Sequence, residues 1–435
     1  MGIILSLIQL ITILIICIYE YKKQQISIFM WATLLIMFGL PHLISVVFNY
    51  STFNDQILYQ ASAFVIGFNI VYLTTKIFID LVLKSENNEP VFFSKVNNHF
   101  SNRDKKLVNT FIILLCISLL IILYVSIVYF GGIENSSWGK FYMLNVELGF
   151  NSPIKYADII FFTVAGVALV LRSNKNKYMF LFTAGLIITY SIVTSNRITI
   201  LPAFMAIIIP IIFSQSKRVS IKKILYFSLI GFLAVYSVYF LRLVRIAGGV
   251  TNFFKEFHFK DINSTISEML LNGDGELGLR NAFYYFISIN NNFPGFNEAA
   301  TYIRILLIGI PTRLIENIKP PDFAITMGSA YTNNLNNTRY SMHPTLYGDV
   351  FANLWWFGIL LAIFWAIFTY AVTKLAKRNN FVMRNMLLSL FGTMFVIIGR
   401  GSVYNGVFIG IQGALLLFLL YYLSQLSMKS KLKYN

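Results

Sequence analysis

Long apolar runs separated by short polar segments extend from the first residues of the chain almost to its last. A transmembrane helix needs about 20 consecutive apolar residues, whereas a membrane β-strand alternates apolar and polar residues over about ten. The runs here are continuous, so the pattern predicts an all-α polytopic membrane protein with about 11 transmembrane helices. The predicted spans are 3–19, 26–48, 57–83, 108–130, 154–171, 178–194, 198–213, 224–241, 346–373, 385–398 and 407–423.

Composition supports this class. The 435 residues are 57% hydrophobic and only 12% charged, with a mean hydropathy of +0.67. A soluble domain usually carries about 25% charged residues, and a globule of this size could not bury so many apolar side chains. A cytosolic enzyme, a disordered chain and a fibrous protein are therefore excluded. The two cysteines, Cys17 and Cys116, lie within apolar runs and predict neither a disulfide framework nor a metal site.

The net charge of +17 would suggest nucleic acid as a partner of a soluble protein. In a polytopic chain it is typical of cytoplasmic loops that are rich in Lys and Arg, so no nucleic acid is expected. Loops on one side carry 21 of the 35 Lys and Arg residues. The opposite side carries 13, of which nine lie in one long loop to which the charge rule does not apply. The N-terminus is therefore expected outside and the C-terminus in the cytoplasm.

Three segments follow from this topology. Residues 1–241 hold transmembrane helices 1–8, and 346–435 hold helices 9–11 with a basic cytoplasmic tail. Residues 242–345 form one large outer loop, which we expect to contain short helices and a re-entrant or interfacial element. A loop of this length is usually functional. The cytoplasmic loops are short and hold no phosphate-binding loop, so any chemistry is expected to use a substrate that is already across the membrane or held in the lipid.

Arginines at predicted helix ends are candidates for an anion site on that face. A guanidinium presents a fixed fork of donors that suits phosphate oxygens, although long basic side chains also simply snorkel to lipid headgroups. Arg197 and Arg400 stand out because each lies in a short loop that departs from the charge bias. The predicted diphosphate- or sugar-binding residues are Arg242, Arg245, Arg280, Arg313, Lys319, Arg339 and Arg400.

A second candidate group opens the ninth span. Pro344 suits a first helical turn, His343 precedes it at the membrane surface, and Asp349 follows inside the helix. Histidine is the side chain best suited to proton transfer near neutral pH, whereas its alternative role here is structural hydrogen bonding. Asp349 would orient His343, pair with an arginine or bind a sugar hydroxyl. The predicted catalytic residues are His343, Asp349 and Arg197.

Four segments carry a resemblance to a known family. TSNRITILPAF (194–204), PTRLIENIKPPDF (311–323), MHPTLYGDVFANLWWFG (342–358) and GRGS (399–402), together with one long outer loop, resemble Wzy-type O-antigen polymerases. These are the bacterial oligosaccharide repeat-unit polymerases, and the O-antigen ligases share their general plan. The matching positions are Arg197, Arg313, His343, Asp349 and Arg400.

The resemblance implies a glycosyltransferase-C-like fold in the bacterial inner membrane, with the large loop and the N-terminus in the periplasm. It implies a glycosyltransferase of surface polysaccharide or lipopolysaccharide biosynthesis that needs no cofactor and no metal. A growing glycan would move from undecaprenyl diphosphate onto a new repeat unit that is itself linked to undecaprenyl diphosphate. The implied partners are these lipid-linked donors and acceptors, membrane lipid, a chain-length regulator and a flippase.

Three alternatives stay open at this stage. An O-antigen ligase would transfer the finished glycan to lipid A core. A polysaccharide flippase or other transporter would usually show internal symmetry, which this sequence does not display to inspection. A sensor or scaffold with an outer binding domain is the third alternative. The sequence leaves open the sugars that are joined, the anomeric outcome, and whether His343 or Asp349 is the base.

Overall fold

The computed structural model is helical, and the residues it describes contain no β-strand. Among these residues, nine helices are long and apolar enough to cross a membrane, and they coincide with nine of the predicted spans. The chain is therefore an all-α, multi-pass membrane protein. The structure describes residues 2–48, 51–83, 101–213, 278–310, 314–315, 318–336 and 341–432, and in addition 229, 233, 236–237, 240–244, 246–247, 252–253 and 255.

Two predicted spans need separate comment. The run at 198–213 forms only the short helix α10 (Leu201–Ile212), which contains Pro202 and Pro210. The run at 224–241 lies largely outside the described residues. The run at 385–398, predicted as one of the shortest spans, belongs to the 19-residue helix α19 (Phe381–Gly399).

Helix α1 (Gly2–Lys22) buries polar side chains and exposes apolar ones, the arrangement expected of a helix in lipid. Its buried residues recur every three or four positions and include the polar side chains Ser6, Gln9 and Glu20. Large apolar side chains between them are exposed, among them Ile4 at 63% and Ile18 at 54%. Water would penalise such a surface, whereas hydrocarbon accepts it. Burial of the polar side chains inside the protein follows from the same physics.

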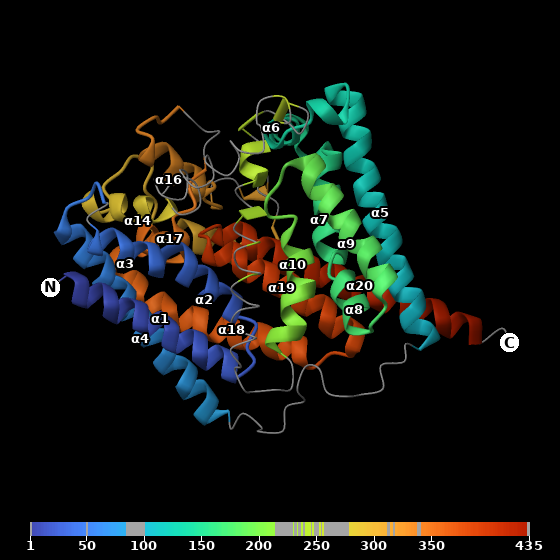
Figure 1. The fold of residues 1–435 in the computed structure, drawn as a ribbon, viewed down its shortest axis with the longest axis horizontal. Coiled ribbons are helices and arrows are strands. Elements are labelled where there is room, and N and C mark those ends of the chain that lie inside the picture. The colour runs from blue at the N-terminus through green and yellow to red at the C-terminus, as the bar shows by residue number, and fades with distance from the viewer. Residues whose placement is uncertain are drawn as a thin grey trace. The chain divides into compact units, whose positions relative to one another are not determined.

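The chain divides into two compact units, of which the first combines residues 1–89, 270–375 and 394–408. In this unit α1 packs along α4 (Asp55–Val82), as Figure 1 shows. The described residues of the predicted outer loop contribute three short helices. The helices of this unit are α1, α2 (Ile28–Leu34), the π-helical turn η1 (Leu35–Gly39), α3 (Leu40–Val47), α4, α14 (Leu279–Ser288), α15 (Ala300–Leu306), α16 (Phe323–Tyr331), α17 (Thr345–Leu354), η5 (Trp355–Leu360), most of α18 (Leu361–Lys377), the end of α19 and the start of α20 (Val403–Leu432).

The span at 345–377 in the first unit is broken. Helix α17 ends at Trp355, which has a positive φ of 51°, and the short 3₁₀ turn η5 precedes α18. Gly358 in this turn lies so close to the carbonyl oxygen of Val350 that a Cβ atom would be only 2.6 Å from it. Tyr347 fixes α17 to α4 through a 2.8 Å hydrogen bond from its hydroxyl to Asn69. The break separates α18 from α17, the helix that carries Asp349.

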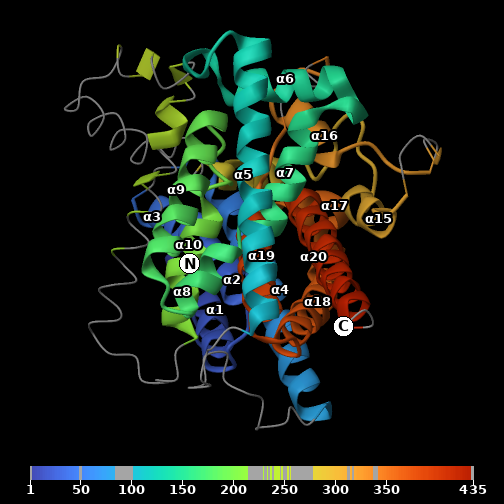
Figure 2. The same cartoon turned by 90° about the vertical axis from the view of Figure 1, so that its right-hand side faces the viewer.

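The second unit combines residues 90–269, 376–393 and 409–435. In it α5 packs along α7 and α9, as Figure 2 shows. Between α7 and α8, Gly166 allows close approach to the backbone of α19, because a Cβ atom there would lie 3.0 Å from the carbonyl oxygen of Met386. Its helices are α5 (Asn102–Phe130), η2 (Ile133–Asn135), α6 (Trp138–Leu148), η3 (Gly149–Asn151), α7 (Pro153–Val164), α8 (Val167–Ser173), α9 (Lys177–Thr194), α10, the first part of α19 and most of α20 (Val403–Leu432).

Candidate functional site

The first unit contains a small cleft beside the start of α17. It has room for about one water molecule. His343 and Asp349, the two acid–base candidates of the sequence, both line it. The lining residues are Thr301, Asp322, Ala324, His343, Asp349, Gly401, Ser402, Val403, Tyr404 and Asn405.

A close backbone contact forms one wall of the cleft. The backbone N–H of Thr345 donates to the carbonyl oxygens of His343 at 3.0 Å and of Arg400 at 3.1 Å. Gly401 has a φ of +100°, and a Cβ atom there would overlap the backbone nitrogen of Thr345. Only glycine suits this conformation and this approach. Thr345 itself has a φ of 64°, which is unusual for a β-branched residue and typical of strained functional segments.

Asp349 is held by neutral donors. It is 2% exposed, and its carboxylate accepts hydrogen bonds from Asn353 Nδ2 at 3.2 Å and from Thr301 Oγ1 at 3.4 Å. Asn353 also donates to Thr301 Oγ1 at 3.0 Å and accepts from the backbone of Thr301 at 2.9 Å. No cation among the described residues lies within ion-pair distance of Asp349. A buried carboxylate without a counter-charge is costly, which makes it a candidate for function.

Asp322 is a second carboxylate on the cleft, and the cation Arg304 lies near it. Its Oδ1 caps α16 by accepting from the backbone of Ala324 at 3.1 Å. Burial raises the pKa of Asp322 above its ordinary value, and the charge of Arg304 opposes that rise. The Arg304 guanidinium donates to the carbonyl oxygen of Pro320 at 2.7 Å and lies 4.7 Å from the ring centre of Tyr404.

Lys319 is the other cation, and it is only 6% exposed. Its ammonium donates to the carbonyl oxygen of Ile310 at 2.7 Å. Burial, together with the charge of Arg304, lowers the pKa of Lys319. Arg304 lies beside the cleft residues Asp322 and Tyr404, and Lys319 lies near Arg304. Two neighbouring cations of this kind suit an anionic group of a substrate.

None of the other predicted site residues that the structure describes is a lining residue of the cleft. Arg280 donates to Ser45 Oγ at 3.0 Å and hydrogen-bonds Tyr284, whose hydroxyl lies 2.6 Å from His42. Arg400 contributes its carbonyl oxygen to the contact with Thr345. Arg197 and Arg242 belong to the second unit, and Arg245, Arg313 and Arg339 lie outside the described residues. The convergence of arginines on one site stays a prediction.

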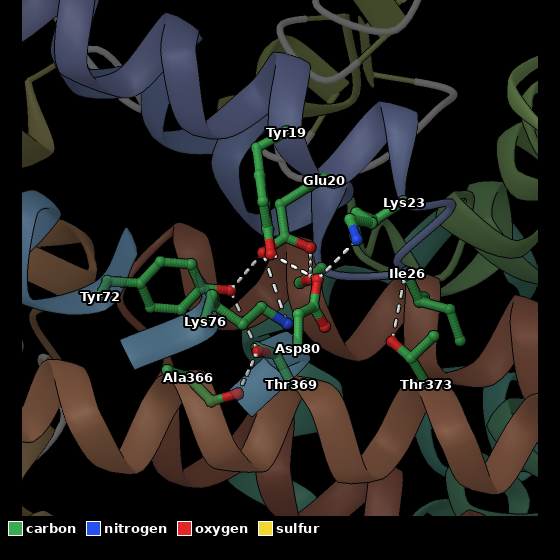
Figure 3. A network of polar contacts seen from close by, with 11 residues as sticks. Tyr19, Glu20, Lys23, Ile26, Tyr72, Lys76, Asp80, Ala366, Thr369 and Thr373 are labelled. Atoms are coloured by element: carbon green, nitrogen blue, oxygen red, sulfur yellow. Dashed lines mark hydrogen bonds and ion pairs between the residues drawn. The ribbon is translucent and has the colours of Figure 1, made fainter. Parts of the chain in front are cut away.

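A separate polar cluster joins α1, α4 and α18 (Figure 3). Glu20 is completely buried and accepts from Ser27 at 2.6 Å and from Tyr72 at 2.7 Å. Lys76, 2% exposed, lies 3.5 Å from the same carboxylate. Tyr72 reaches Thr369 of α18 at 3.0 Å. These bonds connect three helices, so the cluster is best explained as a structural tie.

Sequence reasoning missed several residues of the cleft, including Asp322, Thr301 and Tyr404. Asp322 follows two prolines and precedes an apolar run, which is a helix-start signal that sequence reading can detect. Asn353 lies one helical turn after Asp349, so their hydrogen bond was also accessible to sequence reasoning. Thr301 and Tyr404 carry no such signal, because tertiary packing alone brings them to the cleft.

Searches of protein-family models, curated proteins and solved structures found no match to this chain. In the described part of the chain, no group of three or more His, Cys, Asp or Glu side chains is arranged to hold a metal ion. Function must therefore be inferred from the chemistry of the cleft and from the sequence resemblance.

Proposed function

We propose that the chain is a membrane glycosyltransferase that polymerises lipid-linked oligosaccharide repeat units. One observation carries the proposal. Three of the four segments that resemble Wzy-type polymerases, 311–323, 342–358 and 399–402, contribute lining residues to a single cleft. These segments lie far apart in sequence, and the residues that they bring together can donate, accept and hold protons.

The cleft supports the chemistry of glycosyl transfer. An acceptor hydroxyl oxygen forms a bond to the anomeric carbon of the donor while the bond from that carbon to the diphosphate oxygen breaks. The lipid diphosphate leaves with the electron pair, and the hydroxyl proton passes to a base. His343 and Asp349 are the base candidates from the sequence. Arg304 and Lys319 are suited to stabilise the charge that builds on the leaving diphosphate.

The membrane setting fits a lipid-linked substrate. The cleft lies where the span 345–377 begins and where α19 ends, and the distribution of Lys and Arg assigns these helix ends to the outer face. We therefore place the cleft at the periplasmic face of a bacterial inner membrane, with the N-terminus outside and the C-terminus in the cytoplasm. Exposed apolar helix surfaces suit the polyprenyl chains. A sugar ring is larger than the cleft, so binding requires its walls to separate.

Deletion and complementation test the proposal. Cells without the protein are expected to carry surface lipid capped with one repeat unit, and the wild-type chain should restore a ladder of longer chains on a gel. His343→Ala and Arg197→Ala should each leave the single-repeat product. A normal ladder from either variant would remove that residue from the site. Complete loss of surface glycan in the deletion strain would instead favour a ligase or a flippase.

A further inference from the structure

The cleft offers three side chains that can accept a proton, and they differ in what already occupies their acceptor atoms. Both carboxylate oxygens of Asp349 accept hydrogen bonds from Asn353 or Thr301, and the side chain is almost fully buried. His343 is half-buried, with its Nε2 3.3 Å from Ser341 Oγ. These contacts orient both side chains but compete with a substrate hydroxyl.

Asp322 differs from Asp349 in one respect. Its Oδ1 is fixed by the cap of α16, whereas its Oδ2 has no hydrogen-bond partner among the described residues. The side chain is partly exposed and lines the cleft. One oxygen of Asp322 thus sets the orientation of the carboxylate, and the other remains available to a hydroxyl group in the cleft.

The charged and titratable groups around Asp322 come from several elements. Arg304 of α15 acts on it directly, and Lys319 lies next to Arg304. Asp349 of α17 repels it, and His343 and Tyr404 line the same cleft. Burial favours the protonated form of Asp322, whereas the charge of Arg304 and the hydrogen bond from the Ala324 backbone favour the ionised form. The raised pKa of Asp322 brings it nearer to neutral pH, where a general base is most effective.

We propose that Asp322 is the general base of the reaction, a catalytic residue that the sequence did not reveal. This inference rests on the proposed function. Asp322 Oδ2 accepts the proton of the acceptor hydroxyl as the oxygen bonds to the anomeric carbon, and the diphosphate departs with the electrons of the broken bond. Asp349 then orients the sugar, and Arg304 keeps Asp322 ionisable.

The test uses purified protein in liposomes with a lipid-diphosphate-linked single repeat unit as donor and acceptor. Asp322→Asn and Asp322→Ser both keep a side-chain oxygen that caps α16, but neither can accept the proton. Each should lower turnover about 10²–10⁴-fold with little change in the Michaelis constant. Wild-type turnover should fall as the pH drops through the raised pKa of Asp322, because protonation removes the base. Asp322→Glu should be more active than Asp322→Asn, because it retains a carboxylate. Asp349→Asn should still lose turnover as the pH drops, because Asp322 is intact.

Several results would overturn the assignment. Turnover of Asp322→Asn within about threefold of wild type, with the acidic fall intact, rules out Asp322 as the base. If Asp322→Asn and Asp322→Ser both fail to fold, the pH dependence of wild-type turnover decides. Turnover that is constant between about pH 4 and 8 requires no carboxylate base and would overturn the assignment. If the wild type does not lengthen the repeat unit at all, the proposed function itself fails, which is a distinct result.

Discussion

Replacing Lys76 with methionine should destabilise the protein strongly, because it leaves the Glu20 carboxylate inside the helix bundle without a counter-charge. The side chain of Lys76 is 2% exposed and that of Glu20 is 0% exposed, and Lys76 Nζ lies 3.5 Å from Glu20 Oε1. Removing one partner of a buried ion pair typically costs about 3–5 kcal/mol. Glu20 keeps hydrogen bonds from Ser27 and Tyr72, so we expect a loss of about 3 kcal/mol in the free energy of unfolding.

The double variant Glu20→Gln/Lys76→Met should recover most of that loss. Glutamine retains polar atoms for the hydroxyls of Ser27 and Tyr72, and no charge remains buried, so the expected cost is about 1 kcal/mol. A cycle of the two single variants and the double variant should therefore give a coupling of at least about 2 kcal/mol. Figure 3 shows why the sites couple, since Tyr72 and Lys76 approach the same carboxylate.

Unfolding measured in detergent or bicelles provides the assay. Lys23→Met is the matched control, because Lys23 pairs with Asp80 at 3.0 Å but is 43% exposed. That change should cost less than about 1 kcal/mol, as exposed pairs do. Equal losses for Lys23→Met and Lys76→Met, or a double variant that is less stable than both single variants, would refute the reasoning.

Two further predictions concern the walls of the cleft. Gly401→Ala should lower the free energy of unfolding by about 1–3 kcal/mol and abolish polymer, because its Cβ would overlap the backbone of Thr345. Gly185→Ala, in open space on a helix, should be neutral or slightly stabilising in the same unfolding measurement in detergent or bicelles. Asn353→Leu should cost about 1–3 kcal/mol and reduce chain length on the gel, because Asp349 loses its closest side-chain donor. A full ladder from Asn353→Leu would show that Asp349 needs no such support.

The sequence was informative where a property is local. Continuous apolar runs predicted nine spans that the structure contains, because the length of a run reflects the thickness of a bilayer. Pro344 marked the place where α17 begins, and His343 and Asp349 share a cleft as members of one short segment.

Properties set by tertiary packing could not be read from the sequence. Lys76 and Asp80 are four residues apart on α4, a spacing that indicates a local ion pair, yet Lys76 pairs with Glu20 and Asp80 pairs with Lys23. Arg280, predicted to bind substrate, contacts Ser45 and Tyr284. Packing between helices decides which segments meet in a bundle. A single sequence indicates which face of each helix is buried, but not which helix covers that face.

The most direct test of the central claim is reconstitution of the purified chain in liposomes with a lipid-diphosphate-linked single repeat unit as the only substrate. We predict products of two and more repeats, with release of one lipid diphosphate for each new linkage, in the absence of nucleotide, lipid A core and any partner protein. A repeat unit that stays single in active, folded preparations would contradict the assignment of this chain as a polymerase.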